Sequence, residues 1–183
     1  MSLQLKSEGY IIMDISSKSE IAERHLAGLQ TFYPRVDARV STIFAISSAQ
    51  TAIAAFNYVG PQQASVWQSL LLILFGLSTV IIHVNLYMCT FPKLTGGSET
   101  SMFFAHVAKM GEADFIAKYR TLSEDEIFAD LTKQIWRSSQ ILADKYRHLT
   151  NGTIALAAAS VAWVLFLVLV SAGTGKFPAL SAS

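Results

Sequence analysis

The stretch LSEDEIFADLTKQIWRSSQILADKYRHLTNG, residues 122–152, runs directly into TIALAAASVAWVLFLVLVSA, residues 153–172, and this junction decides the fold. The first part opens like a helix, because Ser123 can cap its N-terminus and Glu126 can return a hydrogen bond to the backbone of Ser123. Its apolar residues recur at spacings of four and seven, which places them on one helical face: Ile127, Leu131, Ile135, Leu142 and Leu149. The second part has no charged residue and is long enough to cross a bilayer. We therefore expect a charged helix, a break at Asn151 and Gly152, and then a membrane span.

A second uncharged region lies earlier in the chain, since no Asp, Glu, Lys or Arg occurs between Arg39 and Lys93. Its length allows two spans of about 20 residues each, which we place at about residues 40–59 and 66–88. The sequence thus predicts an all-α membrane protein with three transmembrane helices and a helical cytosolic region between the second and third spans.

These spans divide the chain into segments: a cytosolic N-terminal segment with one helix (1–39), a transmembrane hairpin (40–90), a helical cytosolic region (91–152), the third transmembrane helix (153–172) and a short external tail (173–183). Lys and Arg number five in the first 40 residues, eight in residues 91–152 and one in the tail. Because positive charge favours the cytoplasmic side, the N-terminus is expected in the cytosol and the C-terminus outside.

Shorter helices are expected in the cytosolic parts. One is predicted at about residues 19–33, after a second capping pattern formed by Ser17 and Glu20. Pro34 either ends this helix or begins the next, because proline fits the first turn of a helix. Two more helices are predicted at about residues 99–109 and 112–120.

The chain lacks the compact motifs of common catalytic sites: it has no Gly-rich phosphate loop, no paired-cysteine metal site, no HExxH and no GxSxG. Its histidines at positions 25, 83, 106 and 148 are scattered. We therefore expect neither an enzyme nor a metal site nor a cofactor. His83 lies inside the predicted second span, where it indicates either a functional ionisable group or a neutral imidazole bonded to a Ser or Thr of a neighbouring helix.

Small and polar residues form stripes on two of the predicted spans. Ser47, Gln50 and Asn57 share a face of the first span, and Ala155 and Ala159 have the spacing that permits close helix contact in the third. The polar stripe either bonds the helices together or lines a water path. With only three spans, a chain has too few helices to enclose such a path alone, so we expect a homo-oligomer.

The cytosolic region combines aromatic and basic side chains: Phe104, Lys133, Trp136, Arg137, Lys145, Tyr146 and Arg147. Aromatic rings that stack on a base, beside cations that hold a phosphate, are typical of nucleotide binding. The alternative interpretation is that the aromatic residues are core and the cations a solvated face near the membrane.

Several short motifs then suggest a family, and they occur in this order: Asp37-Ala38-Arg39-Val40-Ser41 at the entry to the first span, Thr90-Phe91-Pro92 at the exit from the second, the pair Phe103-Phe104, the acidic helix start at Leu122, and Lys145-Tyr146-Arg147 before the third span. Over about residues 35–172 the chain resembles the transmembrane effectors of the bacterial Pycsar antiphage systems. The order and spacing of the motifs together carry the resemblance.

The resemblance implies a function. A partner cyclase would make cyclic UMP or cyclic CMP on infection, and the effector would sense that nucleotide and impair the bacterial inner membrane, causing abortive infection. It also implies a multi-pass protein whose partners are the nucleotide and the lipid bilayer rather than a nucleic-acid polymer. A membrane adaptor or assembly subunit that binds a protein partner without gating is the alternative.

Overall fold

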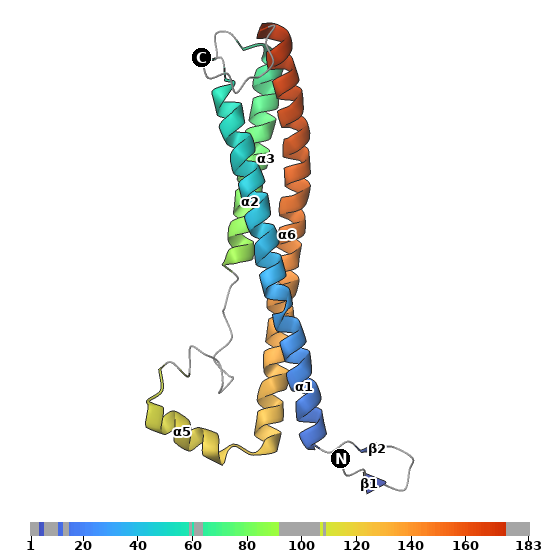
Figure 1. The fold of residues 1–183 in the computed structure, drawn as a ribbon, viewed down its shortest axis with the longest axis vertical. Helices are drawn as coiled ribbons and strands as arrows, with labels where there is room; N and C mark the ends of the chain where they lie inside the picture. The colour runs from blue at the N-terminus through green and yellow to red at the C-terminus, as the bar shows by residue number, and fades with distance from the viewer. Residues whose placement is uncertain are drawn as a thin grey trace. The chain divides into compact units, whose positions relative to one another are not determined.

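A computed structural model describes residues 4–5, 11–12, 15–58, 60, 64–91, 107 and 109–174 of the chain. Its elements occur in the following order (Figure 1): β1 Gln4–Leu5, β2 Ile11–Ile12, α1 Ile15–Gln30, α2 Phe32–Phe56, α3 Val66–Thr90, α5 Glu112–Thr121 and α6 Glu124–Thr174. The two strands pair antiparallel, with Gln4 opposite Ile12 and Leu5 opposite Ile11. Apart from this short ladder, the regular elements of the described residues are helices, as the sequence predicts.

Helix α6 begins where the sequence predicts. The backbone N–H of Ser123 donates to Glu126 Oε2 (2.8 Å), and the backbone N–H of Glu126 donates to Ser123 Oγ (3.3 Å), which confirms the capping box. The bond from the Ser123 backbone, followed by that from its hydroxyl, lowers the pKa of the Glu126 carboxyl below its ordinary value. This polar first turn lies outside the apolar segment of residues 153–172.

The break expected at Asn151 and Gly152 is wrong, because α6 is one helix from Glu124 to Thr174. Gly152 is buried against α3, where an added Cβ would lie 3.7 Å from the Cβ of Asn85. Packing against α3 therefore outweighs the low intrinsic helix propensity of glycine.

The N-terminal helix also differs from its predicted start. The capping role expected of Ser17 and Glu20 is wrong, because α1 begins at Ile15 and both residues lie inside it. At the other end, the N–H and the hydroxyl of Thr31 both donate to the carbonyl oxygen of Gly28, over 3.2 and 2.8 Å. Pro34 then falls in the first turn of α2, so it begins a helix rather than ending one.

Helix α5 confirms the helix predicted at residues 112–120. Glu112 and Asp114 occupy its first turn and Lys118 and Arg120 its last, as the helix dipole favours. The helix predicted at residues 99–109 lies almost entirely outside the described residues, and so do Phe104 and residues 175–183 of the predicted tail.

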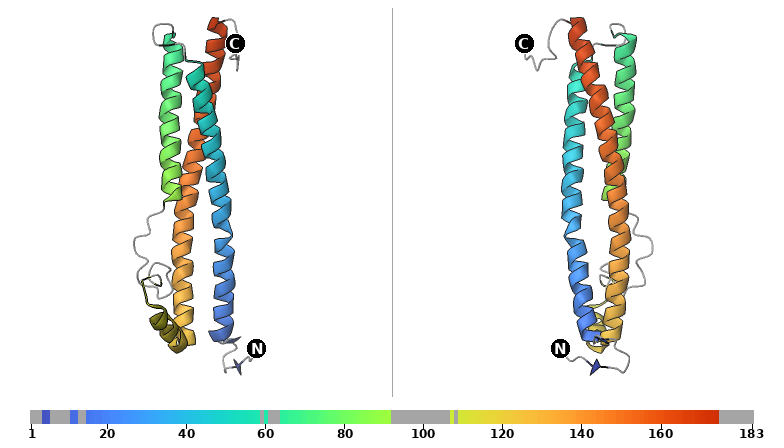
Figure 2. Two further views of the ribbon diagram at one scale, coloured as in Figure 1. Left: turned by 60° about the vertical axis from the view of Figure 1, so that its left-hand side comes forward. Right: turned by 90° about the vertical axis from the view of Figure 1, so that its right-hand side faces the viewer.

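The chain forms two compact units, and unit 2 comprises residues 35–92 and 144–183. In it, α2, α3 and the second half of α6 lie side by side (Figures 1 and 2). Their buried apolar side chains follow helical spacings: Val36, Ile43 and Ala54 on α2, Phe75, Ile82 and Leu86 on α3, and Ala155, Ala159, Ala162, Phe166 and Val170 on α6. Unit 2 is therefore a three-helix bundle with one continuous core.

Unit 1 comprises residues 1–34 and 93–143. The hydroxyl of Tyr33, in the first turn of α2, donates to the carbonyl oxygen of Ser138 in the first part of α6 (3.1 Å). Ala22 on α1 and Leu131 on α6 are buried in this unit. Two long amphipathic helical segments thus pack against each other here.

Two of the described helices are long and apolar enough to cross a membrane, α3 and α6. Helix α2 is as long as α3, but its Ser, Thr and Gln side chains dilute its apolar character. The structure accordingly identifies two candidate spans at the second and third predicted positions, and the first predicted span coincides with a helix of mixed character.

Candidate functional site

A groove of about 450 Å³ lies between α1 and the first part of α6, within unit 1. Its lining comes from two helical faces: Lys18, Ile21, Ala22 and His25 on α1, and Phe128, Thr132, Ile135, Trp136 and Ser139 on α6. Positions spaced by three, four and seven residues lie on one side of a helix, so each set points toward the same space. Local sequence periodicity therefore places these side chains around one groove.

The groove has a mainly apolar floor, and its polar side chains include both hydrogen-bond donors and an acceptor. Trp136 is 68% exposed although it lines the groove. Lys18 supplies an ammonium group and His25 a ring N–H, both from the α1 side. The hydroxyl of Thr132 donates to the carbonyl oxygens of Phe128 and Ala129 in its own helix (3.0 and 2.9 Å), so its oxygen remains available as an acceptor.

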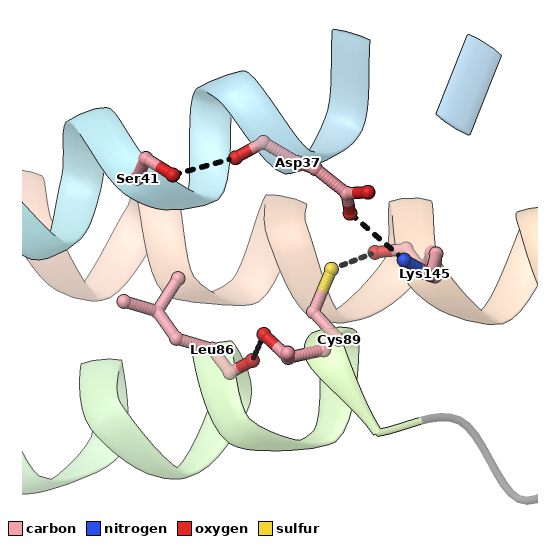
Figure 3. Close-up of polar contacts among 6 residues, drawn as sticks. Asp37, Ser41, Leu86, Cys89 and Lys145 are labelled. Carbon is pink, nitrogen blue, oxygen red and sulfur yellow. Dashed lines mark hydrogen bonds and ion pairs between the residues drawn. The ribbon is translucent and has the colours of Figure 1, made fainter. Parts of the chain in front are cut away.

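A second polar feature lies in unit 2, where Lys145 and Asp37 form an ion pair (Figure 3). The Nζ of Lys145 lies 2.9 Å from Asp37 Oδ1, and the two side chains are 8% and 59% exposed, respectively. The thiol of Cys89 donates to the carbonyl oxygen of Lys145 over 3.4 Å, and Ser41 Oγ donates to the carbonyl oxygen of Asp37 over 3.0 Å. One buried ammonium group thus sits where α2, α3 and α6 meet.

Further along the bundle, Gln50 connects α2 to α6. Its Nε2 donates to Ser160 Oγ (2.9 Å), and Trp163 Nε1 donates to the backbone carbonyl oxygen of Gln50 (3.0 Å). Gln50 Oε1 is buried, and no group among the described residues donates to it. Ser47 is also buried, and its hydroxyl donates to the carbonyl oxygen of Phe44 in its own helix.

The other residues expected to act in the membrane also belong to unit 2. Ala155 and Ala159 are buried in the bundle, while Asn57 is half-buried and its Nδ2 donates to the carbonyl oxygen of Ile53. His83 is half-buried, and its Nδ1 donates to the Thr79 carbonyl oxygen (2.8 Å). The hydrogen bond of His83 therefore stays within its own helix rather than reaching a Ser or Thr of a neighbour.

The residues expected to bind a nucleotide do not gather at one place. Trp136 lines the groove, whereas Lys133 is exposed outside its lining and Arg137 donates to Gln140 Oε1 (3.3 Å). In unit 2, Lys145 is held by Asp37, Arg147 lies 3.3 Å from Asp144 in an exposed ion pair, and Tyr146 is half-buried. Among the described residues, no group of three or more His, Cys, Asp or Glu could hold a metal ion.

Sequence reasoning did not include Lys18, His25 or Thr132 among the binding candidates. Lys18 and His25 are seven residues apart on α1, a spacing that places them on one face of the helix. That periodicity could have indicated a shared face on α1. The α6 side of the groove is more than 100 residues away in the chain, and a single sequence does not show that these two helices pack together.

A family model described as the Pycsar effector protein domain matches residues 21–171. The match covers α1 from Ile21 onward, α2, α3, α5 and almost all of α6, and it confirms the resemblance drawn from the ordered motifs. Comparisons with curated proteins and with solved structures found no match.

Proposed function

Because this chain belongs to the Pycsar effector family, we propose that it senses a cyclic pyrimidine mononucleotide, cyclic UMP or cyclic CMP, and responds by impairing the inner membrane. Membership of the family gives the chain a role as an effector in antiphage defence, in a system where a partner cyclase produces a cyclic nucleotide. Its apolar helices fit a membrane protein. The nucleotide and the manner of membrane damage are the parts that we propose.

The observation that carries the proposal is the extent of the family match. Residues 21–171 include the three-helix bundle and all of the described groove lining except Lys18, which precedes the matched range. A protein that only anchored a partner would need one of these parts, whereas a sensor that acts on a membrane needs both. The chain thus contains a candidate receptor and a candidate effector, and the family match covers the effector bundle and most of the receptor groove.

We propose that α2 crosses the membrane together with α3 and α6. No charged residue occurs between Arg39 and Lys93, and the buried Gln50 and Ser47 lie inside the bundle, away from lipid. The outward residues of α3 are large and apolar: Val66, Leu70, Ile73, Leu77, Val80 and Val84. The distribution of Lys and Arg then supports an N-terminus in the cytosol and a C-terminus outside.

Membrane damage in this proposal requires several copies, because three helices enclose no water path. The nucleotide acts by binding the damaging state of the protein more tightly than the resting state. A preference of about 100-fold contributes about 2.7 kcal/mol to that state. In the change from the resting to the damaging state, the polar contacts inside unit 2 would be replaced by contacts between copies of the chain.

Dye entry into living cells tests this function. Cells that make the protein together with an active pyrimidine cyclase should take up a membrane-impermeant dye, and cells with a catalytically dead cyclase should exclude it. Equal dye entry in both would contradict gating by a nucleotide. Dye exclusion in both, with the protein present in the membrane fraction, would favour the adaptor that binds a protein partner.

A further inference from the structure

We propose that the groove between α1 and α6 in unit 1 is the receptor for a singly charged nucleoside phosphate, with the base on Trp136 and the phosphate at Lys18. This inference rests on the proposed function and assigns its ligand to one place in the chain. It adds α1 to the binding site and assigns no ligand contact to Lys133, Arg137 or Lys145.

The groove has a suitable size. Its volume of about 450 Å³ falls within the range of about 300–1,000 Å³ that is usual for small-molecule sites. A cyclic mononucleotide has about 20 heavy atoms, which at the binding efficiency of such ligands corresponds to an affinity near micromolar. A groove with both walls on paired helices can hold such a ligand without a dedicated loop.

Trp136 supplies the platform for a base. The exposed fraction of this side chain is 68%, so its ring is accessible to a ligand in the groove. The ring borders an apolar floor that includes Ile21, Ala22 and Ile135, so a base lying on it would be covered on one side and open on the other. Stacking of this kind accepts any base and gives affinity rather than sequence preference.

Lys18 and His25 supply the polar contacts on the α1 side. Among the residues that the structure describes, no carboxylate forms an ion pair with Lys18, so its ammonium group is available to an anion. A cyclic phosphodiester carries a single negative charge, which one ammonium group balances. His25 can donate a ring N–H, while the Thr132 oxygen can accept from a ribose hydroxyl or a base N–H.

The charge of the groove also bears on the charge of its ligand. Lys18 is its only Lys or Arg among the described lining residues. A nucleoside triphosphate would bring several negative charges, and the groove offers one cation to bind them. The single charge of a cyclic nucleotide therefore matches the single cation of the described lining.

Calorimetry of the purified full-length protein in detergent tests this assignment, with cyclic UMP, cyclic CMP, cyclic AMP and cyclic GMP as probes. Trp136→Ala should weaken binding by about 5-fold to 150-fold, the range measured for one stacked base. Trp136→Phe should retain part of that affinity because it retains a ring. Lys18→Gln should weaken binding by about tenfold.

Matched controls separate the groove from other surfaces. Trp67 is 71% exposed and lies on α3, and Lys133 is exposed on α6 outside the groove lining, so Trp67→Ala and Lys133→Gln should leave affinity unchanged. Circular dichroism of each variant confirms that its helices are intact.

The outcomes distinguish this inference from the function on which it rests. If the wild-type protein binds none of the four nucleotides, the proposed function itself fails. If it binds one of them, and both Trp136→Ala and Lys18→Gln bind it equally well, the groove assignment is overturned while nucleotide sensing stands. If Trp136→Ala instead splits a ligand-free oligomer in sedimentation, the groove holds a second copy of the chain and the assignment is likewise overturned.

Discussion

Removal of Asp37 should destabilise the bundle of unit 2 more than removal of Lys145, although Lys145 is the more deeply buried partner. Asp37→Ala leaves the buried ammonium group without this carboxylate, whereas Lys145→Met removes the charge, keeps an apolar stem of similar length and leaves Asp37 facing solvent. The order of the two effects thus follows from which of the two charges water can reach.

The magnitude lies between two limits. Breaking a fully buried pair costs about 3–5 kcal/mol, and an exposed pair is worth about 0–1 kcal/mol. Since the Lys145 side chain is 8% exposed and that of Asp37 is 59% exposed, we expect about 1–3 kcal/mol of lost stability for Asp37→Ala. For Lys145→Met we expect less than about 1 kcal/mol.

Thermal unfolding in detergent, followed by circular dichroism, measures both effects. For a chain of this size each kcal/mol shifts the unfolding midpoint by about 2–4 °C. The double variant should be about as stable as Lys145→Met alone, because the Asp37 substitution has nothing left to disrupt. A Lys145→Met variant that is destabilised as much as Asp37→Ala would refute the reasoning from exposure.

Further predictions concern topology and the bundle interior. A reporter active only in the periplasm should be active when fused after Ser183 and silent when fused after Thr121; the reverse pattern would contradict the proposed orientation. Ala159→Leu, at a position with 0% exposure, should cost about 1–3 kcal/mol by overpacking and abolish dye entry, while Ala158→Leu on the exposed side should do neither. Gln50→Leu should change the unfolding midpoint by only a few degrees, because it loses one hydrogen bond but also removes a buried oxygen without a donor; loss of dye entry in this folded variant would indicate that the polar stripe serves conduction, and retained dye entry that it serves packing.

Local sequence patterns predicted the individual helices well and their contacts poorly. The capping box at Ser123 is complete within four residues, and it forms as expected. The break at Gly152 failed because the deciding contact comes from α3, far away in the chain. The spacing of the cations on α6 likewise could not show that Lys145 faces Asp37 while Lys133 faces solvent.

The candidate site shows the same limit. An aromatic residue among cations marked Trp136 as a binding candidate, and the structure places it on a groove. The opposite wall comes from α1, and a single sequence carries no sign that Lys18 lies across from Trp136. The first predicted span was drawn from the absence of charged residues alone, whereas the Ser, Thr and Gln side chains of α2 leave α3 and α6 as the candidate spans among the described helices.

Gln50 Oε1 is a buried acceptor to which no described group donates, so the packed bundle is less stable than a fully hydrogen-bonded one. Leaving such a group without a donor costs about 1–3 kcal/mol, which is similar to what a ligand with a hundredfold preference can supply. Under the proposed gating, a resting bundle with one unpaired acceptor is easier to leave than a bundle in which every polar group is hydrogen-bonded. A substitution that gives this oxygen a donor should therefore stabilise the resting bundle and, under the same proposal, make it harder to activate.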